Sequence, residues 1–397
     1  MFKTLDDIEI NGSRVLVRGD LNVPMRDGKV SDATRIERLA PTLRELSDNG
    51  ARVIVMSHFG RPKGKVVEAM SLRAVVAPLS EAVGGRQVSF ADDCVGEVAK
   101  QAAAALKPGD LLLLENLRFH AGEEANDGEF AAELASLGEI YVNDAFSAVH
   151  RAHASTEAIT RFLPAVAGRS LQAECAALSS ALETPARPVM AIVGGAKVST
   201  KLEVLGNLTP RVDQLVIAGA MANTFLQARG CQVGASLVEP ALVDEAGSIL
   251  ERAGQVGCTI NLPLDATVAT AIESDIETRE VGIDQVPDDC MILDIGPRTI
   301  SQLTALLATC STLLWNGPLG VFEAPPFDRG TVAIAGHAAA LTEAGELMSL
   351  AGGGDTVAAL RHAGVLDRLS YVSTAGGAFL EWLEGKSLPG LVALEPK

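Results

Sequence analysis

The fold of this chain is decided by the stretch Arg14-Val15-Leu16-Val17-Arg18-Gly19-Asp20-Leu21-Asn22-Val23-Pro24. A short apolar run leads directly into a loop of charged, amide, glycine and proline residues. The apolar residues are continuous and do not alternate with polar ones, which is typical of a strand that is buried on both faces of a parallel sheet. The stretch therefore predicts an inner strand that ends in a polar loop.

The same pattern recurs along the chain. Longer stretches with helical periodicity, such as Glu129–Leu137 and Gln302–Leu307, separate the apolar runs. Strands that alternate with helices predict the α/β class, with parallel strands joined by crossover helices. The further predicted strands are Ala51–Met56, Leu111–Leu114 and Ile140–Val142 in the first half, and Val189–Val193, Leu215–Ile217, Met291–Ile295, Thr312–Trp315, Leu347–Leu350 and Tyr371–Val372 in the second.

A break near the middle of the chain divides it into domains. The length of 397 residues favours two or three domains, at about 150 residues for each. Two prolines in Thr184–Pro188 end the helical stretch Ser170–Leu182 and stiffen the entry into the next strand. We therefore expect a domain boundary there, with the preceding helix as the connector.

Composition excludes several classes of partner. The formal net charge is −17, and the chain has only two Trp and two Tyr residues, so we expect neither nucleic acid nor an anionic membrane as a partner. The six cysteines lack the spacing of a zinc site or a disulfide framework and are expected to be reduced thiols. No apolar run approaches a membrane span, and residues 1–7 turn acidic at once, so we expect a cytoplasmic protein.

The predicted strand ends of the first half carry basic residues. Ligands of open α/β sheets bind beyond the carboxyl ends of the strands. We expect the arginines there to converge with His58 and to bind an anion, because guanidinium groups match phosphate and carboxylate oxygens. Each residue alone is also typical of a solvated loop. The segments are Arg18–Pro24, Ser57–Lys65, Glu115–Phe119, Asn143–Phe146 and His150–His153, and the arginines are Arg35, Arg61, Arg118 and Arg151.

The strand ends of the second half are rich in glycine. Glycine lets backbone N–H groups approach phosphate oxygens, and the N-terminus of a following helix adds partial positive charge. Asp355 either caps the helix that follows it, binds Mg²⁺, or does both, and Lys197 and Lys201 share one face if a single helix includes both. Strand-to-helix turns also need glycine for purely structural reasons. The segments are Gly194–Lys201, Ala218–Met221, Asn316–Glu323, Gly352–Thr356 and Ser373–Gly377.

Several better-known catalytic motifs are missing. Gly385-Lys386-Ser387 resembles the end of a P-loop, but Leu380 occupies the required earlier glycine position. No GxGxxG follows a predicted strand, and neither a GxSxG elbow nor an HExxH motif occurs. These absences weaken dinucleotide-binding, serine-hydrolase and zinc-protease interpretations.

Together these segments resemble the phosphoglycerate kinase family over essentially the whole chain and in the family's order. The resemblance implies two Rossmann-like domains, each a parallel sheet flanked by helices, joined by a connector helix and a hinge. It implies a 3-phosphoglycerate domain at 1–169, a connector helix at 170–184, a nucleotide domain at 185–373 and a C-terminal segment at 374–397 that returns to the first domain. It also implies MgATP or MgADP as the second substrate and a monomeric state.

The resemblance carries over the following roles. The phosphoglycerate-binding residues are Asp20, Leu21, Asn22, Arg35, His58, Phe59, Gly60, Arg61, Arg118 and Arg151. The nucleotide-binding residues are Lys197, Lys201, Gly219, Asn316, Pro318, Val321, Glu323, Gly353, Gly354, Asp355 and Thr356, with Asp355 as the Mg²⁺ ligand. Four positions depart from glycines that are common in the family: Ala218, Ala220, Ile292 and Ala375.

The implied reaction joins ATP and 3-phosphoglycerate to give ADP and 1,3-bisphosphoglycerate, reversibly, as in glycolysis. The attacking carboxylate titrates near about 4 and is already ionised, so no general base is required. Our hypothesis assigns Arg35 and Lys197, assisted by Mg²⁺ and the N–H groups near Gly376 and Gly377, to the charge on the transferring group. Domain closure would bring these groups together and exclude water.

Two other classes of protein compete with this interpretation. A different two-domain kinase, or an ATP-dependent ligase acting on a small acid, would share the glycine loops but not all of the first-half motifs. A non-catalytic two-lobed binding protein would have no use for a second set of phosphate loops, and its usual periplasmic form needs a signal peptide.

Overall fold

The computed structural model describes residues 2–274 and 276–396 and consists of two compact units. Unit 1 comprises Met1–Ala176 and Ser387–Lys397, and unit 2 comprises Ala177–Lys386. The boundary between them falls within helix α6 (Arg169–Leu182). Helix α13 (Gly376–Leu383) therefore belongs to unit 2, and helix α14 (Pro389–Val392) belongs to unit 1. The finer domain limits expected from the resemblance stay predictions.

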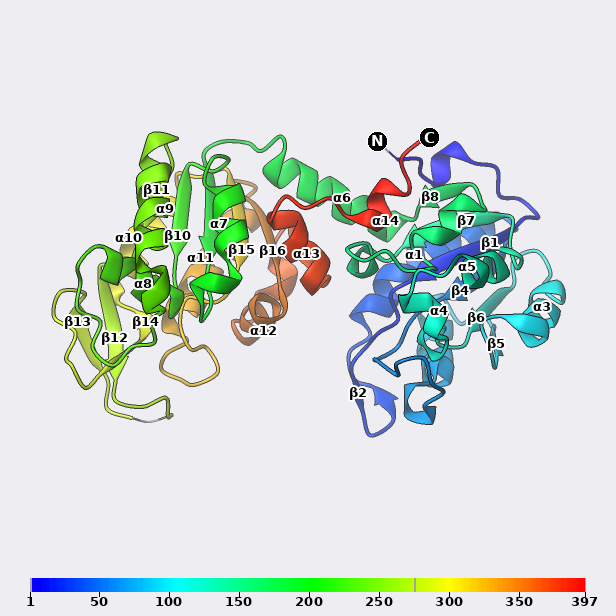
Figure 1. The fold of residues 1–397 in the computed structure, drawn as a ribbon, viewed down its shortest axis with the longest axis horizontal. Coiled ribbons are helices and arrows are strands. Elements are labelled where there is room, and N and C mark those ends of the chain that lie inside the picture. The colour runs from blue at the N-terminus through cyan, green and yellow to red at the C-terminus, as the bar shows by residue number, and fades with distance from the viewer. Residues whose placement is uncertain (1, 275, 397) are drawn as a thin grey trace. The chain divides into compact units, whose positions relative to one another are not determined.

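Unit 1 is built on a six-stranded parallel sheet with the order β5-β6-β4-β1-β7-β8. Helices lie on both faces of the sheet (Figure 1). The strands are β1 (Arg14–Gly19), β4 (Arg52–Met56), β5 (Val88–Ala91), β6 (Leu111–Leu114), β7 (Ile140–Asp144) and β8 (Ala165–Ala167). The helices are α1 (Thr34–Asp48), α2 (Val76–Ala82), α3 (Gly96–Ala104), α4 (Ala121–Glu124) and α5 (Gly128–Ala135), and a small hairpin joins β2 (Met25–Arg26) to β3 (Lys29–Val30).

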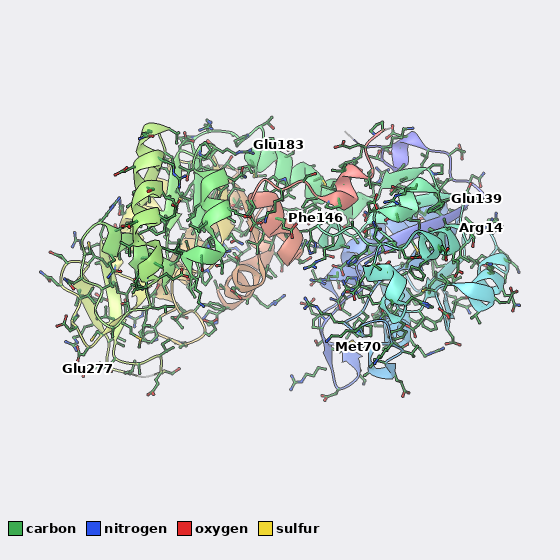
Figure 2. All side chains as sticks on the ribbon, in the orientation of Figure 1. Arg14, Met70, Glu139, Phe146, Glu183 and Glu277 are labelled. Carbon is green, nitrogen blue, oxygen red and sulfur yellow. The ribbon has the colours of Figure 1, made fainter. Side chains whose placement is uncertain are left out.

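Strand β1 lies in the interior of its sheet, as its sequence predicted. Val15 pairs with Val53 of β4 on one side and with Ile140 of β7 on the other, and Val15, Leu16 and Val17 are all fully buried. At the amino ends of β1 and β7, Arg14 N donates to Glu139 Oε2 at 2.7 Å (Figure 2). The carboxyl ends of β6, β4, β1 and β7 therefore lie side by side at the opposite edge of the sheet.

Unit 2 has the same plan. Its parallel sheet has the order β11-β10-β9-β15-β16-β17, again with helices on both faces (Figure 1). The strands are β9 (Val189–Val193), β10 (Gln214–Ile217), β11 (Thr259–Asn261), β15 (Thr312–Asn316), β16 (Met348–Gly352) and β17 (Tyr371–Ser373). The helices are α7 (Leu202–Leu208), α8 (Met221–Ala228), α9 (Val243–Gln255), α10 (Pro297–Leu307), α11 (Arg329–Glu343), α12 (Gly354–His362) and α13.

One strand prediction was wrong in its placement. Met291–Ile295 is a strand, β14, but it pairs antiparallel with β12 (Asp265–Ala269) in a small separate sheet completed by β13 (Arg279–Gly282). Continuous apolar sequence indicates burial on both faces and says nothing about strand direction. The other strands predicted from apolar runs are confirmed within a few residues.

In both units the first strand lies inside the sheet, and the later strands are added first on one side of it and then on the other. Strand β1 lies between β4 and β7, and β9 lies between β10 and β15. Such a reversal of strand order opens a crevice at the carboxyl ends of the strands, where open α/β sheets bind ligands. The topology thus predicts one ligand-binding site in each unit. We call the edge of the sheet formed by the carboxyl ends of its strands the rim of that unit.

Two expectations from composition concern the whole chain. None of the six cysteines forms a disulfide bond, and Cys94, Cys258, Cys290 and Cys310 are buried. Among the described residues, none forms a helix with the length and apolar character needed to cross a membrane.

Candidate active site

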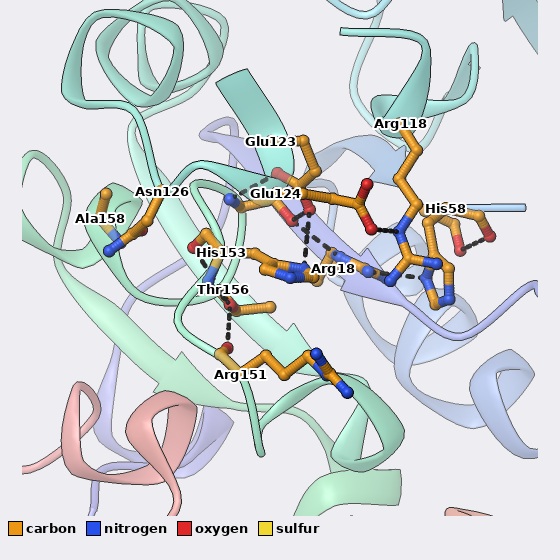
Figure 3. A network of polar contacts seen from close by, with 12 residues as sticks. Arg18, His58, Arg118, Glu123, Glu124, Asn126, Arg151, His153, Thr156 and Ala158 are labelled. Carbon is orange, nitrogen blue, oxygen red and sulfur yellow. Dashed lines mark hydrogen bonds and ion pairs between the residues drawn. The ribbon is translucent and has the colours of Figure 1, made fainter. Parts of the chain in front are cut away.

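The rim of unit 1 is centred on Arg18, the last residue but one of β1. Its side chain is 1% exposed, so this charge is removed from water and must be held by hydrogen bonds. Nε donates to Ser155 Oγ at 3.0 Å, Nη1 donates to the carbonyl oxygen of Gly19, and Nη2 lies 2.9 Å from His58 Nδ1. Figure 3 shows Arg18 at the centre of this network, with His58 on one side and Glu123 on the other.

A buried carboxylate balances the charge of Arg18. Glu123 is fully buried and accepts hydrogen bonds from Ser155 N at 2.9 Å and from Ser155 Oγ at 2.6 Å. Burial raises the pKa of Glu123, while the positive charge of Arg18 and the bonds from Ser155 oppose that rise. Tyr141 Oη donates to the Ser155 carbonyl at 2.7 Å, which fixes Ser155 as the bridge between the two charges.

This network sets the protonation of His58. A guanidinium group has only donors, so His58 Nδ1 accepts the hydrogen bond from Arg18, and the ring proton lies on Nε2. Burial, together with the positive charges of Arg18, Arg118 and Arg35, holds the pKa of His58 well below its usual range. His58 is therefore a neutral imidazole with a fixed Nε2–H donor.

Arg35, on helix α1, is held against the loop that follows β1. Its Nη1 lies 3.2 Å from Asp20 Oδ2 and donates to the Asn22 carbonyl at 2.8 Å. Ser147 Oγ donates to Asp20 Oδ2 at 2.7 Å, and Gly60 N donates to Asn22 Oδ1 at 2.9 Å. These bonds bring together loops that follow β1, β4 and β7, as the parallel strand ends predicted.

Arg118 follows β6 on the 3₁₀ turn η4 (Leu117–Phe119). Its Nη1 donates to the Gly60 carbonyl at 2.9 Å, and Glu124 Oε1 lies 3.4 Å from its Nε. That Nε is buried and has no hydrogen-bond partner within residues 2–274 and 276–396. Burial lowers the pKa of Arg118, and repulsion from Arg18 and Arg61 adds to the effect although Glu124 opposes it. Arg118 is therefore a partly desolvated cation whose Nε–H can still donate a hydrogen bond.

The remaining predicted cations lie at the outside of the rim. Arg61 and Arg151 are exposed, and Arg151 Nε lies 3.3 Å from His150 Nε2. Burial, with the charges of Arg118, Arg18 and Arg151, lowers the pKa of His153 to about 4. Burial is the main cause of the low pKa values of His58 and His153, and the arginines add to it because several positive charges face one another here. An anion relieves such repulsion.

Three residues of this network were missed as site residues from the sequence: Arg18, Glu123 and Ser155. A signal for Arg18 exists, because it is a charged residue that directly follows the apolar run of a strand predicted to be buried. Glu123 and Ser155 gave no signal, since Glu123 lies in the short helix α4, Ser155 lies in a polar turn, and each is buried only through contacts with distant residues. Leu21 and Phe59 are buried, and their amides donate to Ser57 Oγ at 3.0 Å and Asn116 Oδ1 at 3.1 Å.

The rim of unit 2 is centred on Asn316, the last residue of β15. Its Nδ2 donates to the Gly352 carbonyl of β16 at 2.7 Å, and its Oδ1 accepts a hydrogen bond from Lys201 Nζ. Gly194 N donates to the Asn316 carbonyl at 2.8 Å. Asn316 thus links the ends of three strands, β9 through its main-chain carbonyl and β16 through its amide side chain, and the same side chain orients a lysine.

Glycine at this rim is required by the close approach of backbones. A Cβ on Gly194 would collide with the Pro318 carbonyl oxygen, and Gly317, at φ +101°, would collide with Gly194 in the same way. Gly353 also has φ +101°, which strongly disfavours any residue with a side chain. The glycines bring the backbone of three strand ends together, as the glycine-rich sequence suggested.

The two lysines of this segment do not share a helical face. Lys197 precedes the 3₁₀ turn η7 (Val198–Thr200), and Lys201 precedes α7, so no single helix includes both. Lys201 is half-buried, and burial lowers its pKa although Asp355 and Glu384 oppose the change. Lys197 is exposed next to Ser199, whose hydroxyl donates to Glu239 Oε1 at 2.6 Å.

Asp355 does not cap helix α12. The cap position is Gly353, where no side-chain capping hydrogen bond is made, and Asp355 is exposed in the first turn. Thr356 is the buried residue of this turn: its Oγ1 accepts from Gly317 N at 2.7 Å and donates to the Gly352 carbonyl at 2.8 Å. The sequence left capping and cation binding open for Asp355, and the geometry leaves its carboxylate available for a cation.

The other predicted nucleotide residues surround this centre. Gly219 N donates to the Leu319 carbonyl at 3.0 Å, and Val321 N donates to the Leu293 carbonyl at 2.9 Å. Glu323 is exposed and Pro318 half-buried. Gly354 opens α12, and Gly376 and Gly377 open α13. In the described part of the chain, no hydrogen bond connects Lys197 or Glu323 with Lys201 or Asn316.

The departures from common glycines are compatible with the backbone. Ala375 has φ −90° and Ala220 has φ −63°, both ordinary values for alanine. Ala218 is buried in the core of unit 2. Ile292 lies in β14, and its backbone N donates a hydrogen bond to Ser236 Oγ at 2.8 Å. None of Ala218, Ala220, Ile292 and Ala375 has a positive φ.

Known proteins are similar to this chain along nearly its whole length. A family model described as phosphoglycerate kinase matches residues 5–386. The phosphoglycerate kinase of Granulibacter bethesdensis is 62% identical over 99% of this chain and 99% of that protein. Two solved structures are similar: phosphoglycerate kinase from Coxiella burnetii (TM-score 0.91, 41% identity, 99% of each chain) and from Pyrococcus horikoshii (TM-score 0.82, 30% identity, 99% of this chain and 98% of that one).

Proposed function

Because the chain belongs to the phosphoglycerate kinase family, we propose that its two rims divide the family's reaction between them. The enzyme is a phosphotransferase of glycolysis with a carboxyl acceptor: ATP and 3-phosphoglycerate give ADP and 1,3-bisphosphoglycerate, reversibly. The rim of unit 1 binds the phosphoglycerate and the rim of unit 2 binds the nucleotide. The observation that carries this division is the contrast between clustered guanidinium groups in one unit and glycine-lined strand ends in the other.

The phosphoglycerate half-site uses fixed donors of two kinds. Arg35, Arg61, Arg118 and Arg151 supply positive charge, and neutral His58 supplies the Nε2–H donor that Arg18 fixes. Asp20 and Asn22 hold Arg35 and Gly60 in place. Burial strengthens these interactions, because a charge-assisted hydrogen bond is stronger where water is excluded. Leu21 and Phe59 complete the half-site.

The nucleotide half-site uses helix N-termini and lysines. Helices α12 and α13 begin at glycines at the rim, and free N–H groups at helix N-termini favour phosphate oxygens. Lys201, oriented by Asn316, and Lys197 add positive charge. The further members of the half-site are Gly219, Pro318, Val321, Glu323, Gly353, Gly354, Asp355 and Thr356.

The residues present also fit Mg²⁺. Asp355 offers an exposed carboxylate that is not used as a helix cap, and Mg²⁺ is commonly held by one or two carboxylates, substrate phosphates and water. When bound, Mg²⁺ neutralises charge on the phosphate oxygens. Asp355 would hold it, and Lys201 would lie within electrostatic reach of that carboxylate.

The reaction requires the protein to position the two substrates and to supply positive charge to the transferring group. The phosphoglycerate carboxylate is ionised at neutral pH and attacks the γ-phosphorus directly, forming a C–O–P bond while the bond to the ADP oxygen breaks. Arg35, Lys197 and the N–H groups of Gly376 and Gly377 stabilise charge on the transferring group. Direct transfer needs the two substrates in contact, so the hinge must allow the two units to close during turnover.

Finer features of the working state belong to the same proposal. We expect a monomer that acts in the cytoplasm on small-molecule substrates. Six cysteines without a disulfide are typical of a reducing compartment. Sedimentation of the purified enzyme with both substrates would reveal any oligomer.

A coupled assay tests the assignment of residues. With glyceraldehyde-phosphate dehydrogenase, NADH oxidation should require both ATP and 3-phosphoglycerate. Arg35→Ala and Lys197→Ala should each lower kcat by about 10²–10³-fold, by analogy with loss of an oxyanion-hole donor. Arg44→Ala, an exposed arginine on the same helix as Arg35, and Lys100→Ala, an exposed lysine, are the matched controls. Near-normal kcat in folded Arg35→Ala or Lys197→Ala would remove that residue from the mechanism.

A further inference from the structure

Unit 1 contains a second polar cluster, which the reaction above does not use. Asp93 and Cys94 follow strand β5, and His120 follows the turn η4. One ligand atom of each residue, a carboxylate oxygen, the thiol sulfur and a ring nitrogen, lies within 4.8 Å of the other two. It is the one such cluster of potential metal ligands in residues 2–274 and 276–396. Residues far apart in sequence form it, so no motif spacing indicates it.

The three ligands are held by their surroundings. The His120 ring stacks on Phe130 with centroids 5.2 Å apart and an interplanar angle of 26°. Asp93 Oδ1 accepts hydrogen bonds from Cys94 N at 2.7 Å and lies 2.7 Å from His120 Nε2. These contacts fix the imidazole plane and the carboxylate, so a cation that replaces the proton between them needs little rearrangement.

The three ligands differ in exposure, so the cluster has a buried side and a solvent-facing side. Cys94 is fully buried, whereas the side chains of Asp93 and His120 are 43% and 33% exposed. A cation can therefore enter from the solvent side and reach the thiol behind. Burial raises the pKa of the Cys94 thiol, and the negative charges of Asp93, Glu123 and Glu115 add to the rise. The same negative charges favour a bound cation.

We propose that Asp93, Cys94 and His120 bind a thiophilic divalent cation of the Zn²⁺ type, with water as the fourth ligand. A thiolate, an imidazole and a carboxylate are ligands that Zn²⁺ accepts in tetrahedral geometry, whereas Mg²⁺ prefers oxygen alone. On binding, the thiol proton and the proton between His120 and Asp93 pass to solvent, and no oxidation occurs. The site is thus separate in chemistry from the MgATP half-site.

Occupancy of this site would also affect the phosphoglycerate rim. His120 directly follows η4, the turn that carries Arg118. A cation that joins His120 to the end of β5 stiffens the segment between Arg118 and Glu124, whose side chains form an ion pair. Zn²⁺ therefore stabilises unit 1 against unfolding, since the unfolded chain does not hold the three ligands together.

Cobalt is the probe for the test, because Co²⁺ replaces Zn²⁺ and is coloured. Metal-free full-length protein titrated with Co²⁺ should show a thiolate-to-cobalt charge-transfer band that saturates at one equivalent. Cys94→Ser should lose that band. Cys258→Ser is the matched control, another buried cysteine outside the cluster, and should titrate like the wild type. Absence of the band in the wild type, or its persistence in Cys94→Ser, would overturn the proposal.

A second variant keeps the test decisive if Cys94→Ser folds poorly. His120→Asn retains the thiol and should weaken Co²⁺ binding by about tenfold or more, since loss of even an outer-shell partner costs about 10–100-fold. Zn²⁺ should raise the melting temperature of the wild type and have a smaller effect on His120→Asn, with Mg²⁺ as the reference ion. Equal Co²⁺ affinity in the wild type and His120→Asn would show that the cluster is not the binding site.

Discussion

The two units share one topology but recognise anions by different means. In each, the first strand is internal and the strand order reverses beside it, so each unit has a rim at the same place. The rim of unit 1 is built from side chains, with Arg18 buried among Ser155, His58 and Glu123. The rim of unit 2 is built from backbone, with glycines that let strand ends touch.

The difference shows what a fold does and does not determine. The order of the strands determines where a ligand binds, because the carboxyl ends of parallel strands meet at one edge. The residues at that edge determine which ligand binds. Guanidinium groups and a fixed imidazole recognise a small acid through its charges, while helix N-termini and glycine backbone recognise a chain of phosphates. Each rim should therefore fail in a characteristic way when mutated.

The largest effect is expected from removing the buried charge of unit 1. Arg18→Met leaves Glu123 buried without its counter-charge, and breaking such a buried pair costs about 3–5 kcal/mol of unfolding free energy. His58 also loses the donor that fixes its Nδ1 as an acceptor. Urea denaturation should show the destabilisation, and the KM for 3-phosphoglycerate should rise while that for ATP is unchanged.

A control for this variant is available in the same unit. Arg161 is exposed and pairs with Glu157 one helical turn away, so Arg161→Met should cost only about 0.3–0.5 kcal/mol. If Arg18→Met were no more destabilising than Arg161→Met, the network around Arg18 would have no structural role.

The corresponding test in unit 2 changes backbone instead of charge. Gly353→Ala forces an alanine to φ +101° and places a Cβ 2.6 Å from Asn316 Nδ2. Strain of this kind costs about 1–3 kcal/mol, and the displaced Asn316 should raise the KM for ATP but not that for 3-phosphoglycerate. Gly336→Ala is the control, since this glycine lies inside α11 with open space around its Cα, and the change should stabilise by about 0.5–1 kcal/mol.

Each unit contains a buried carboxylate, and the two predict how the stability of each unit depends on pH. Asp144 accepts a hydrogen bond from Leu171 N in the first turn of α6, and Asp294 accepts one from Gly330 N in the first turn of α11. Burial raises the pKa of both from the ordinary 3.8 to about 7, although these bonds oppose the rise. Between about pH 4 and pH 7 the folded state therefore binds more protons than the unfolded state.

The sign of the effect follows from this difference in bound protons. The stabilising contribution is complete below pH 4 and is lost as the pH rises through 7, by at most about 1.4 kcal/mol per pH unit for each group. Asp144→Asn and Asp294→Asn should each flatten the slope of the unfolding free energy between pH 4 and 7. Calorimetry that separates the two units should assign the first change to unit 1 and the second to unit 2. Unchanged slopes would mean that these groups are ionised in the folded protein.

The sequence predicted the strands that form each rim better than it predicted the polar contacts made there. Continuous apolar runs located β1, β4, β6 and β7, and parallel strand ends then implied that Arg35, Arg118 and His58 face one another. Short edge strands such as β5 and β8 were missed, because three or four residues beside one neighbour carry too little apolar periodicity. Pattern alone also could not distinguish β14, which is antiparallel, from the parallel strands.

The polar interior of the rims could not be predicted for a different reason. Ser155 bonds Arg18 across more than a hundred residues of chain and joins it to Glu123. Such a network depends on tertiary packing, which leaves no local periodicity in the sequence. The exposure of Lys197 and the burial of Lys201 are likewise decided by where a 3₁₀ turn ends and α7 begins, and helix ends are the least predictable feature of a sequence.

The smallest expected effect comes from Ala375, one of the alanines that replace a glycine common in the family. Ala375 has φ −90° and ψ 15°, so its side chain fits a backbone that needs no glycine. Ala375→Gly should destabilise by only about 0.4–1 kcal/mol, chiefly by giving the unfolded chain more freedom. The KM for ATP should stay unchanged, in contrast to Gly353→Ala. A raised affinity for ATP in Ala375→Gly would instead mean that the methyl group limits how closely the nucleotide approaches α13.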